Sequence, residues 1–170
     1  MTAAVFVDTN VLVYARDGRD ALRQARAGAW LAHLWRTRSG RLSTQVLSEY
    51  YTTMTRKLVP GLKREEAWRH VQTLLEWGPR PLDEHLLARA HELDRRYRLS
   101  WWDTLIVAAA QLEGCAVLLT EDLQDGARFD EVVVRSPFKL AIEEAGAQYG
   151  LADSPPERHR KRGRPARVRA

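Results

Sequence analysis

The sequence lacks several features that mark secreted, membrane-bound or zinc-binding proteins. Among its 170 residues there is one cysteine, Cys115, which excludes an internal disulfide framework and a zinc site built on cysteines. The longest apolar run, 105–110, has six residues, whereas a membrane-spanning helix needs about 20. A secretory signal begins with a basic stretch, whereas here no basic residue precedes the first carboxylate, Asp8. We therefore expect a protein of the reducing cytoplasm that makes no membrane contact.

Common catalytic signatures are also missing. The chain contains no Walker-type loop, no Gly-x-Gly-x-x-Gly, no Gly-x-Ser-x-Gly and no His-Glu-x-x-His. Its five histidines are scattered without ligand-like spacing, so we expect them to be solvated or part of the core. These absences argue against the usual phosphate-loop, serine-hydrolase and zinc-hydrolase sites. They leave the carboxylates as the candidate catalytic groups.

The positive charge of the chain is concentrated in one terminal segment. Lysine and arginine number 27 against 22 aspartates and glutamates, a formal net charge of +5. Seven of these basic residues follow Glu157, where no acid occurs, so residues 1–157 carry a net charge of −2. The Pro155-Pro156 pair marks the junction. We predict one folded domain over 1–150 and a basic, disordered tail over 151–170.

Short apolar runs alternate with amphipathic segments along the folded domain. Strands are expected at 4–7, 41–44, 116–119 and 132–134, and helices at 20–37, 45–58, 64–77, 84–97 and 101–113. Apolar strands separated by helices are typical of a parallel sheet that is covered on both faces. The pattern therefore predicts an α/β fold with a central parallel sheet.

Carboxylates occur where such a sheet has its binding edge. Asp8 follows the first strand, and Asp122 follows the strand at 116–119. In open parallel sheets the binding crevice lies outside the carboxyl ends of the strands. Glu49 and Asp103, both on predicted helices, are able to face the same crevice. Oxygen ligands of this kind suit Mg²⁺ or Mn²⁺, which can promote phosphoryl displacement, so the acids indicate a nuclease or a phosphatase.

Each acid also has an ordinary structural interpretation. Asp8 could be a helix N-cap or a turn residue. Asp103 closes a Ser-x-x-acid capping box that begins at Ser100. Glu49 could be a solvated helix carboxylate, and Asp122 lies in a turn that favours aspartate in any case. Taken singly, none of the four establishes a function.

Four segments together resemble a known family. They are Val-Phe-Val-Asp-Thr-Asn-Val-Leu-Val-Tyr (5–14), Ser-Thr-Gln-Val-Leu-Ser-Glu-Tyr (43–50), Leu-Ser-Trp-Trp-Asp-Thr-Leu-Ile-Val-Ala-Ala-Ala (99–110) and Leu-Leu-Thr-Glu-Asp-Leu-Gln-Asp-Gly (118–126), with Ser-Pro-Phe at 136–138. In this order they resemble PIN-domain proteins, above all the VapC-type toxin ribonucleases of bacterial toxin–antitoxin pairs. The resemblance implies a three-layer α/β/α sandwich and a Mg²⁺- or Mn²⁺-dependent endoribonuclease that hydrolyses RNA. It also implies a homodimer and an antitoxin partner.

The resemblance assigns roles to individual residues by position. Asp8 and Asp103 would be the central metal ligands, and Glu49 a further ligand, direct or through water, that orients the attacking water. Asp122 stands where the family has Asp or Asn and would be the fourth acid, with Asp125 as a weaker candidate. Further candidates are a hydroxyl from Thr9 or Thr120, and the indole of Trp101 as a stacking surface for a base. The six tryptophans as a group are expected in the core.

The tail departs from the compact form of the family. Arg162-Gly163-Arg164-Pro165, preceded by Lys161, resembles the core of an AT-hook, an element that binds the minor groove of DNA. We consider Lys161, Arg162 and Arg164 as candidate nucleic-acid contacts, and a generic polycation as the alternative.

Three other functions stay open at this stage. The chain could be an inactive PIN scaffold used for binding, although all four acids are present. It could be a phosphatase of the haloacid-dehalogenase type, although the second aspartate of that family is replaced here by Asn10. It could also be a DNA-binding regulator that acts through its tail, which would leave the acids unexplained.

Overall fold

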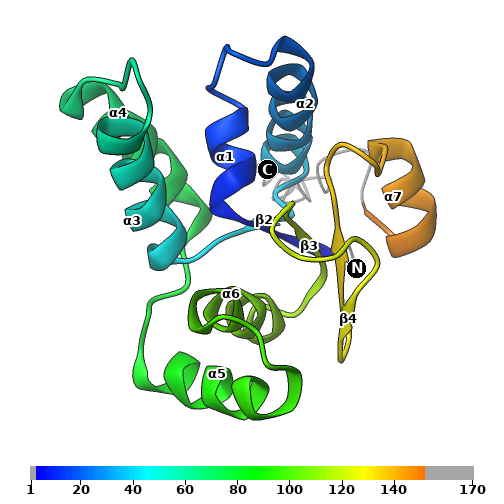
Figure 1. Cartoon of the computed structure of the whole chain (residues 1–170). Helices are drawn as coiled ribbons and strands as arrows, with labels where there is room; N and C mark the ends of the chain where they lie inside the picture. The colour runs from blue at the N-terminus through cyan, green and yellow to red at the C-terminus, as the bar shows by residue number, and fades with distance from the viewer. Residues whose placement is uncertain (1–2, 152–170) are drawn as a thin grey trace, which may run out of the picture.

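A computed structural model describes residues 3–151 of the chain. The candidate contacts Lys161, Arg162 and Arg164 lie outside the described residues. Figure 1 shows a central sheet with α1 and α2 on one side and α5 and α6 on the other. The predicted α/β fold with three layers is confirmed.

The sheet has five strands in the order β2-β1-β3-β5-β4. They are β1 (Ala4–Val7), β2 (Gly40–Arg41), β3 (Cys115–Leu119), β4 (Arg128–Phe129) and β5 (Val132–Arg135). Neighbours are parallel except for β4 and β5, which are antiparallel. The predicted central parallel sheet is confirmed for β2, β1, β3 and β5, and the short strand β4, which the sequence pattern does not predict, is added antiparallel at its edge. Only two residues, Asp130 and Glu131, connect β4 to β5, and so short a turn can join only antiparallel strands.

The helices flank this sheet. They are α1 (Thr9–Tyr14), α2 (Ala21–Thr37), α3 (Thr44–Thr52), α4 (Arg64–Leu74), α5 (Glu84–Tyr97), α6 (Trp101–Leu112) and α7 (Ile142–Tyr149), with a π-helical segment at Thr53–Lys57 and a 3-10 turn at Leu75–Trp77. The predicted helices at 20–37, 84–97 and 101–113 agree with α2, α5 and α6 to within one residue at each end. Within residues 3–151 no helix is both long and apolar enough to cross a membrane.

Two differences from the predicted helices have a local cause. The helix expected over 45–58 ends as α-helix at Thr52 and continues as the π-helical segment. Three threonines crowd this stretch, and the Thr55 hydroxyl donates to the Tyr51 carbonyl at 2.7 Å, so side-chain bonds compete with the regular ladder. The helix α1 was not predicted because Asp-Thr-Asn is typical of a turn. In the structure Asp8 instead caps α1 by accepting from the Thr9 N–H.

The central strands form the core, but most tryptophans do not. The β1 and β3 residues Val5, Phe6, Val7, Val117, Leu118 and Leu119 are fully buried. Trp30 is buried as well, whereas Trp35, Trp68, Trp101 and Trp102 are 39–62% exposed. The expectation that the tryptophans as a group belong to the core is therefore wrong.

The sheet has its topological switch point at β1. The chain passes from β1 to β2 on one side and then returns to β3 on the other side of β1. The Asp8 N–H donates to the Leu119 carbonyl at 3.1 Å, so β1 and β3 end side by side. A crevice outside this point is the usual ligand site of such sheets.

Candidate active site

Asp8 is the most deeply buried of the four candidate acids, with 6% of its surface exposed. Its carboxylate accepts hydrogen bonds from the Thr9 N–H and the Thr120 hydroxyl, each at 2.7 Å. Burial raises the pKa of Asp8 from 3.8 to about 7, and the nearby carboxylates of Asp122 and Glu49 act in the same direction. The two hydrogen bonds act against this rise without cancelling it. Ionised Asp8 is therefore a costly charge unless a cation lies beside it.

Asn10 joins the end of β1 to the loop after β3. Its amide nitrogen donates to Asp8 Oδ2 at 3.2 Å, to the Thr120 hydroxyl at 2.9 Å and to Asp122 Oδ2 at 3.0 Å. The Asp122 N–H in turn donates to the Thr120 hydroxyl at 3.1 Å. Asp122 itself is exposed. The structure thus brings Asp8 and Asp122 together as expected, through an asparagine whose role the sequence did not reveal.

Glu49 reaches the same group of residues from α3. The Thr9 hydroxyl donates to its Oε2 at 3.1 Å, and the Gln45 amide donates to its Oε1 at 2.8 Å. Gln45 also donates to the Trp102 carbonyl at 3.4 Å, which ties α3 to the first turn of α6. Gln45 was missed at the sequence level, although its spacing of four residues from Glu49 places both on one helix face.

Asp103 lies in the first turn of α6 and is held by Ser100. The Asp103 N–H donates to the Ser100 hydroxyl at 3.1 Å, and this hydroxyl donates to Asp103 Oδ2 at 2.6 Å. The predicted role of Ser100 as the helix cap is confirmed. The Asp103 carboxylate retains its second oxygen for another partner. The bond from Gln45 to the carbonyl of its neighbour Trp102 connects this turn to α3, but within residues 3–151 no hydrogen bond joins Asp103 to Asp8, Glu49 or Asp122.

Asp125 bonds residues at the end of β5 rather than the other candidate acids. It accepts hydrogen bonds from the Ser136 N–H at 2.7 Å and from the Arg135 guanidinium at 3.2 Å. Partial burial acts to raise its pKa, but these bonds prevail and the pKa lies below the ordinary value. Asp125 therefore secures its loop to the end of β5, and we do not include it among the candidate ligands.

An arginine fixes the loop that carries Thr120 and Asp122. Arg23, from α2, forms an ion pair with Glu121 and donates to the Tyr14 hydroxyl at 2.8 Å. Its guanidinium lies 5.0 Å from the ring centroids of both Tyr14 and Phe138. A planar cation that contacts two rings and a carboxylate has reduced freedom, so Arg23 restrains Glu121, the residue directly before Asp122. Arg23 is a positioning residue that sequence reasoning did not identify.

The donor atoms fit a divalent cation, with water among its ligands. Asn10 Oδ1 and Gln45 Oε1 are buried without a hydrogen-bond partner within the described residues, but it is the amide nitrogens of these residues that face the carboxylates of Asp8, Asp122 and Glu49. Such unpaired acceptors are costly, and amide and carboxylate oxygens are the ligands that Mg²⁺ and Mn²⁺ prefer. In residues 3–151 no three His, Cys, Asp or Glu side chains gather closely enough to hold a metal on their own. The carboxylates around Asp8 therefore suit Mg²⁺ or Mn²⁺ only with water as most of the remaining ligands, an arrangement that is common for Mg²⁺.

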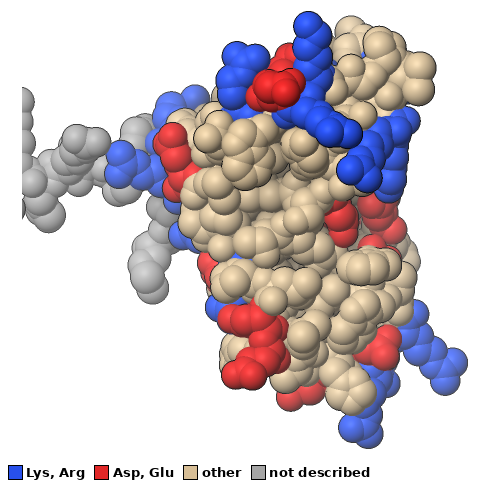
Figure 2. All heavy atoms as spheres, turned by 90° about the vertical axis from the view of Figure 1, so that its left-hand side faces the viewer, with Lys and Arg blue, Asp and Glu red and all other residues tan. Residues whose placement is uncertain are grey.

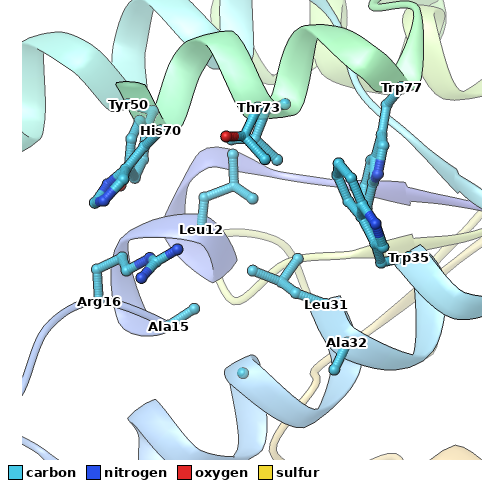
Figure 3. A pocket seen from close by; sticks show the side chains of 12 residues that line it. Leu12, Ala15, Arg16, Leu31, Ala32, Trp35, Tyr50, His70, Thr73 and Trp77 are labelled. Carbon is cyan, nitrogen blue, oxygen red and sulfur yellow. The ribbon is translucent and has the colours of Figure 1, made fainter. Parts of the chain in front are cut away.

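A hollow of about 390 Å³ lies apart from the four candidate acids. Figure 3 shows it between α1, α2 and α4, with Leu12, Leu31, Trp35 and Trp77 around an open space. Tyr50 and His70 close one end, where the Tyr50 hydroxyl and His70 Nδ1 are 2.8 Å apart. None of the four acids lines this hollow. Its mostly apolar lining suits a protein segment better than a phosphate group.

Comparisons with known proteins agree with this architecture. Residues 5–132 match the model of the PIN domain family. No curated protein sequence matches the chain significantly.

Solved structures of toxin–antitoxin proteins have a similar fold. A toxin–antitoxin complex from Klebsiella pneumoniae is 23% identical with a TM-score of 0.57, over 81% of this chain and 100% of that one. FitAcB from Neisseria gonorrhoeae is 22% identical with a TM-score of 0.61, over 80% and 99%. VapC20 of Mycobacterium tuberculosis, a toxin that cleaves the sarcin–ricin loop, is 22% identical with a TM-score of 0.59, over 76% and 99%. At these identities the likeness concerns the fold.

Proposed function

The chain belongs to the PIN domain family, and from this premise we propose that it is a Mg²⁺- or Mn²⁺-dependent endoribonuclease, the toxin of a toxin–antitoxin pair. The observation that supports this most is the buried Asp8 carboxylate, whose ionisation is opposed by burial and by two neighbouring acids. A bound cation reverses this balance, because an adjacent positive charge favours the ionised form. The site also lies at the switch point of the sheet, where a substrate has access.

The chain offers a role for each acid. Asp8 and Asp103 would be the central metal ligands, with Glu49 and Asp122 beside them. When bound, the cation supplies Lewis-acid stabilisation of the charge that develops on a phosphodiester. Glu49 is oriented by Thr9 and Gln45 and can accept a proton from an attacking water. Thr120 and Asn10 hold the Asp8 and Asp122 carboxylates at one place.

Cleavage of single-stranded RNA by the full chain tests this proposal directly. We expect discrete internal cleavage products with Mg²⁺ or Mn²⁺ and none with EDTA, because the acids alone repel an anionic substrate. Gel electrophoresis of an end-labelled RNA measures both. Cleavage that persists in EDTA would contradict the metal-dependent mechanism. No cleavage of any RNA with either cation would favour an inactive PIN scaffold.

The hollow of Figure 3 is the surface that we assign to the antitoxin. Relatives of this fold occur in toxin–antitoxin complexes, some of them bound to DNA. An amphipathic segment can place its apolar side chains against Leu12, Leu31 and Trp35.

The homodimer implied by the resemblance stays a prediction. Binding of nucleic acid by Lys161, Arg162 and Arg164 in the tail also stays a prediction. Such binding would release about one counterion for each phosphate that the tail neutralises.

Leu31→Arg is expected to weaken the complex with the antitoxin at least about tenfold, because it buries a charge in an apolar contact. RNA cleavage by the free protein should be unchanged, since Leu31 is remote from the acids. The matched control is Leu22→Arg on the same helix, at a residue that is 74% exposed and does not line the hollow. Co-purification with the antitoxin, once its reading frame is identified, measures binding. Equal binding by both variants would exclude this surface.

A further inference from the structure

A hollow of about 340 Å³ opens next to the candidate active site, between α3 and the first turn of α6. Glu49 belongs to its lining and to the acid group at once. Trp102 forms one wall and Lys57 lies at its border. The hollow is therefore continuous with the place where a phosphodiester would react, and it is of the size that small planar ligands occupy.

Trp102 presents an aromatic face at this position. It is 62% exposed, the most of the described tryptophans, and it directly precedes Asp103. The bond from the Gln45 amide to the Trp102 carbonyl fixes its backbone against α3. Trp101, which sequence reasoning favoured as a stacking residue, is less exposed at 39% and does not line the hollow. The structure therefore favours Trp102 over Trp101 as the residue on which a base would stack.

A row of three hydroxyl side chains on α3 belongs to the lining of the hollow, which is otherwise mostly apolar. Thr44, Ser48 and Thr52 follow one another at intervals of four residues on α3 and all line the hollow, so they share one helix face. A hydroxyl can donate or accept a hydrogen bond, which suits the varied edge of a nucleobase. Lys57, at the end of the π-helical segment, adds a cation for a backbone phosphate.

The surrounding surface fits a ligand that is bound by stacking. Figure 2 shows this side of the molecule with mostly uncharged side chains at its centre and with basic and acidic side chains around its margins. Single-stranded RNA is recognised in this way, by bases stacked on aromatic rings and by cations along the backbone. A second copy of the chain could also cover an apolar face. However, a concave site that holds a candidate catalytic carboxylate and a lysine favours the nucleic acid.

We propose that this hollow is a nucleobase subsite, in which one unpaired base beside the scissile phosphate stacks on Trp102 while Lys57 contacts the backbone. The hydroxyl row on α3 lies against the edge of that base. This subsite rests on the proposed function, because it takes the substrate of that function to be single-stranded RNA. It explains an exposed tryptophan that neither the core nor the metal ligands account for.

RNA binding without turnover tests the subsite. Full-length chain carrying Asp8→Asn is titrated, in EDTA, into a labelled single-stranded RNA of 12 uridines, and fluorescence anisotropy gives the affinity. Adding Trp102→Ala should weaken binding by roughly 5- to 150-fold, the range for loss of one stacked base. Trp102→Phe should retain most of the affinity because it keeps a stacking ring. The matched control is Trp101→Ala, at the adjacent tryptophan, which is 39% exposed and does not line this hollow.

An abasic scan makes the test specific to a base. Removing each base of the RNA in turn should reveal one position where the loss weakens binding to the background protein but not to its Trp102→Ala form. Absence of any such position would overturn the subsite, and so would equal losses for Trp102→Ala and Trp101→Ala.

Light scattering on the same samples reports self-association. Dissociation of a dimer by Trp102→Ala, with unchanged affinity for RNA, would assign the face to a second copy and overturn the proposal. The outcome is separable from the proposed catalysis. If the chain binds RNA in a base-dependent way but cleaves none, the subsite is retained and the proposed nuclease activity is rejected. If the chain cleaves RNA but its binding does not depend on Trp102, the nuclease activity is retained and the subsite is rejected.

Discussion

Asp8→Asn is expected to reduce RNA cleavage to below about 1% of wild type and, at the same time, to stabilise the metal-free protein at pH 8. The activity falls because a central candidate ligand is lost, and loss even of the groups that support ligands costs about 10- to 100-fold. The stability rises because asparagine carries no charge, while the pKa of Asp8 in the fold is raised by burial to about 7. Loss of function with a gain in stability separates a functional carboxylate from a structural one.

The raised pKa of Asp8 determines how the difference in stability between the two proteins changes with pH. Below pH 3.8 the carboxyl is protonated in both the folded and the unfolded chain and costs nothing. Between 3.8 and about 7 the unfolded chain ionises while the folded chain keeps its proton, so the free energy of unfolding falls as the pH rises. Above pH 7 the full cost is present, on the order of 4 kcal/mol. Asp8→Asn removes it, so the two proteins should differ at pH 8 and converge toward pH 4.

Urea unfolding at both pH values in EDTA measures this difference, and Mg²⁺ should then stabilise the wild type but not the variant. The matched control is Asp125→Asn. The pKa of Asp125 is lowered by its bonds to Ser136 and Arg135, so its ionised form stabilises the fold above its ordinary pKa. Its replacement should destabilise the protein at pH 8 and leave cleavage in place. RNA cleavage by Asp8→Asn at the wild-type rate would refute the assignment.

Asp103→Asn is expected to abolish cleavage with little change in melting temperature. The amide oxygen of asparagine can still accept the hydrogen bond that the Ser100 hydroxyl donates to Asp103, so the start of α6 is retained. Ser100→Ala should do the opposite. It removes the acceptor of the Asp103 N–H and is expected to cost about 1 kcal/mol of stability, with measurable cleavage remaining.

Thermal unfolding and RNA cleavage of the two variants, measured side by side, decide between ligand and cap. If Asp103→Asn keeps its activity and loses as much stability as Ser100→Ala, Asp103 is only a capping residue. That result would reduce the candidate ligands to Asp8, Glu49 and Asp122, and it would weaken the proposed nuclease as a whole.

Much of the fold could be predicted because its signals are local. Strand β3 is a continuous apolar run, and α5 repeats apolar residues at helical spacing between a capping Asp83 and a left-handed Arg98. The failures have local causes too. The helix α1 begins within Asp8-Thr9-Asn10, a segment typical of a turn. Strand β4 has only two residues, too few to show an alternation of apolar and polar side chains.

The sequence by itself determined the α/β alternation, the four candidate acids and their order along the chain. Only the tertiary structure decided which neighbours hold them. Asn10 bonds Thr120 across 110 positions of sequence, and Thr9 bonds Glu49 across 40. No local pattern encodes such pairs, because they exist only once β1 and β3 end side by side and α3 packs beside them. The same applies to Trp102, since the two adjacent tryptophans differ only in what the folded chain places against each of them.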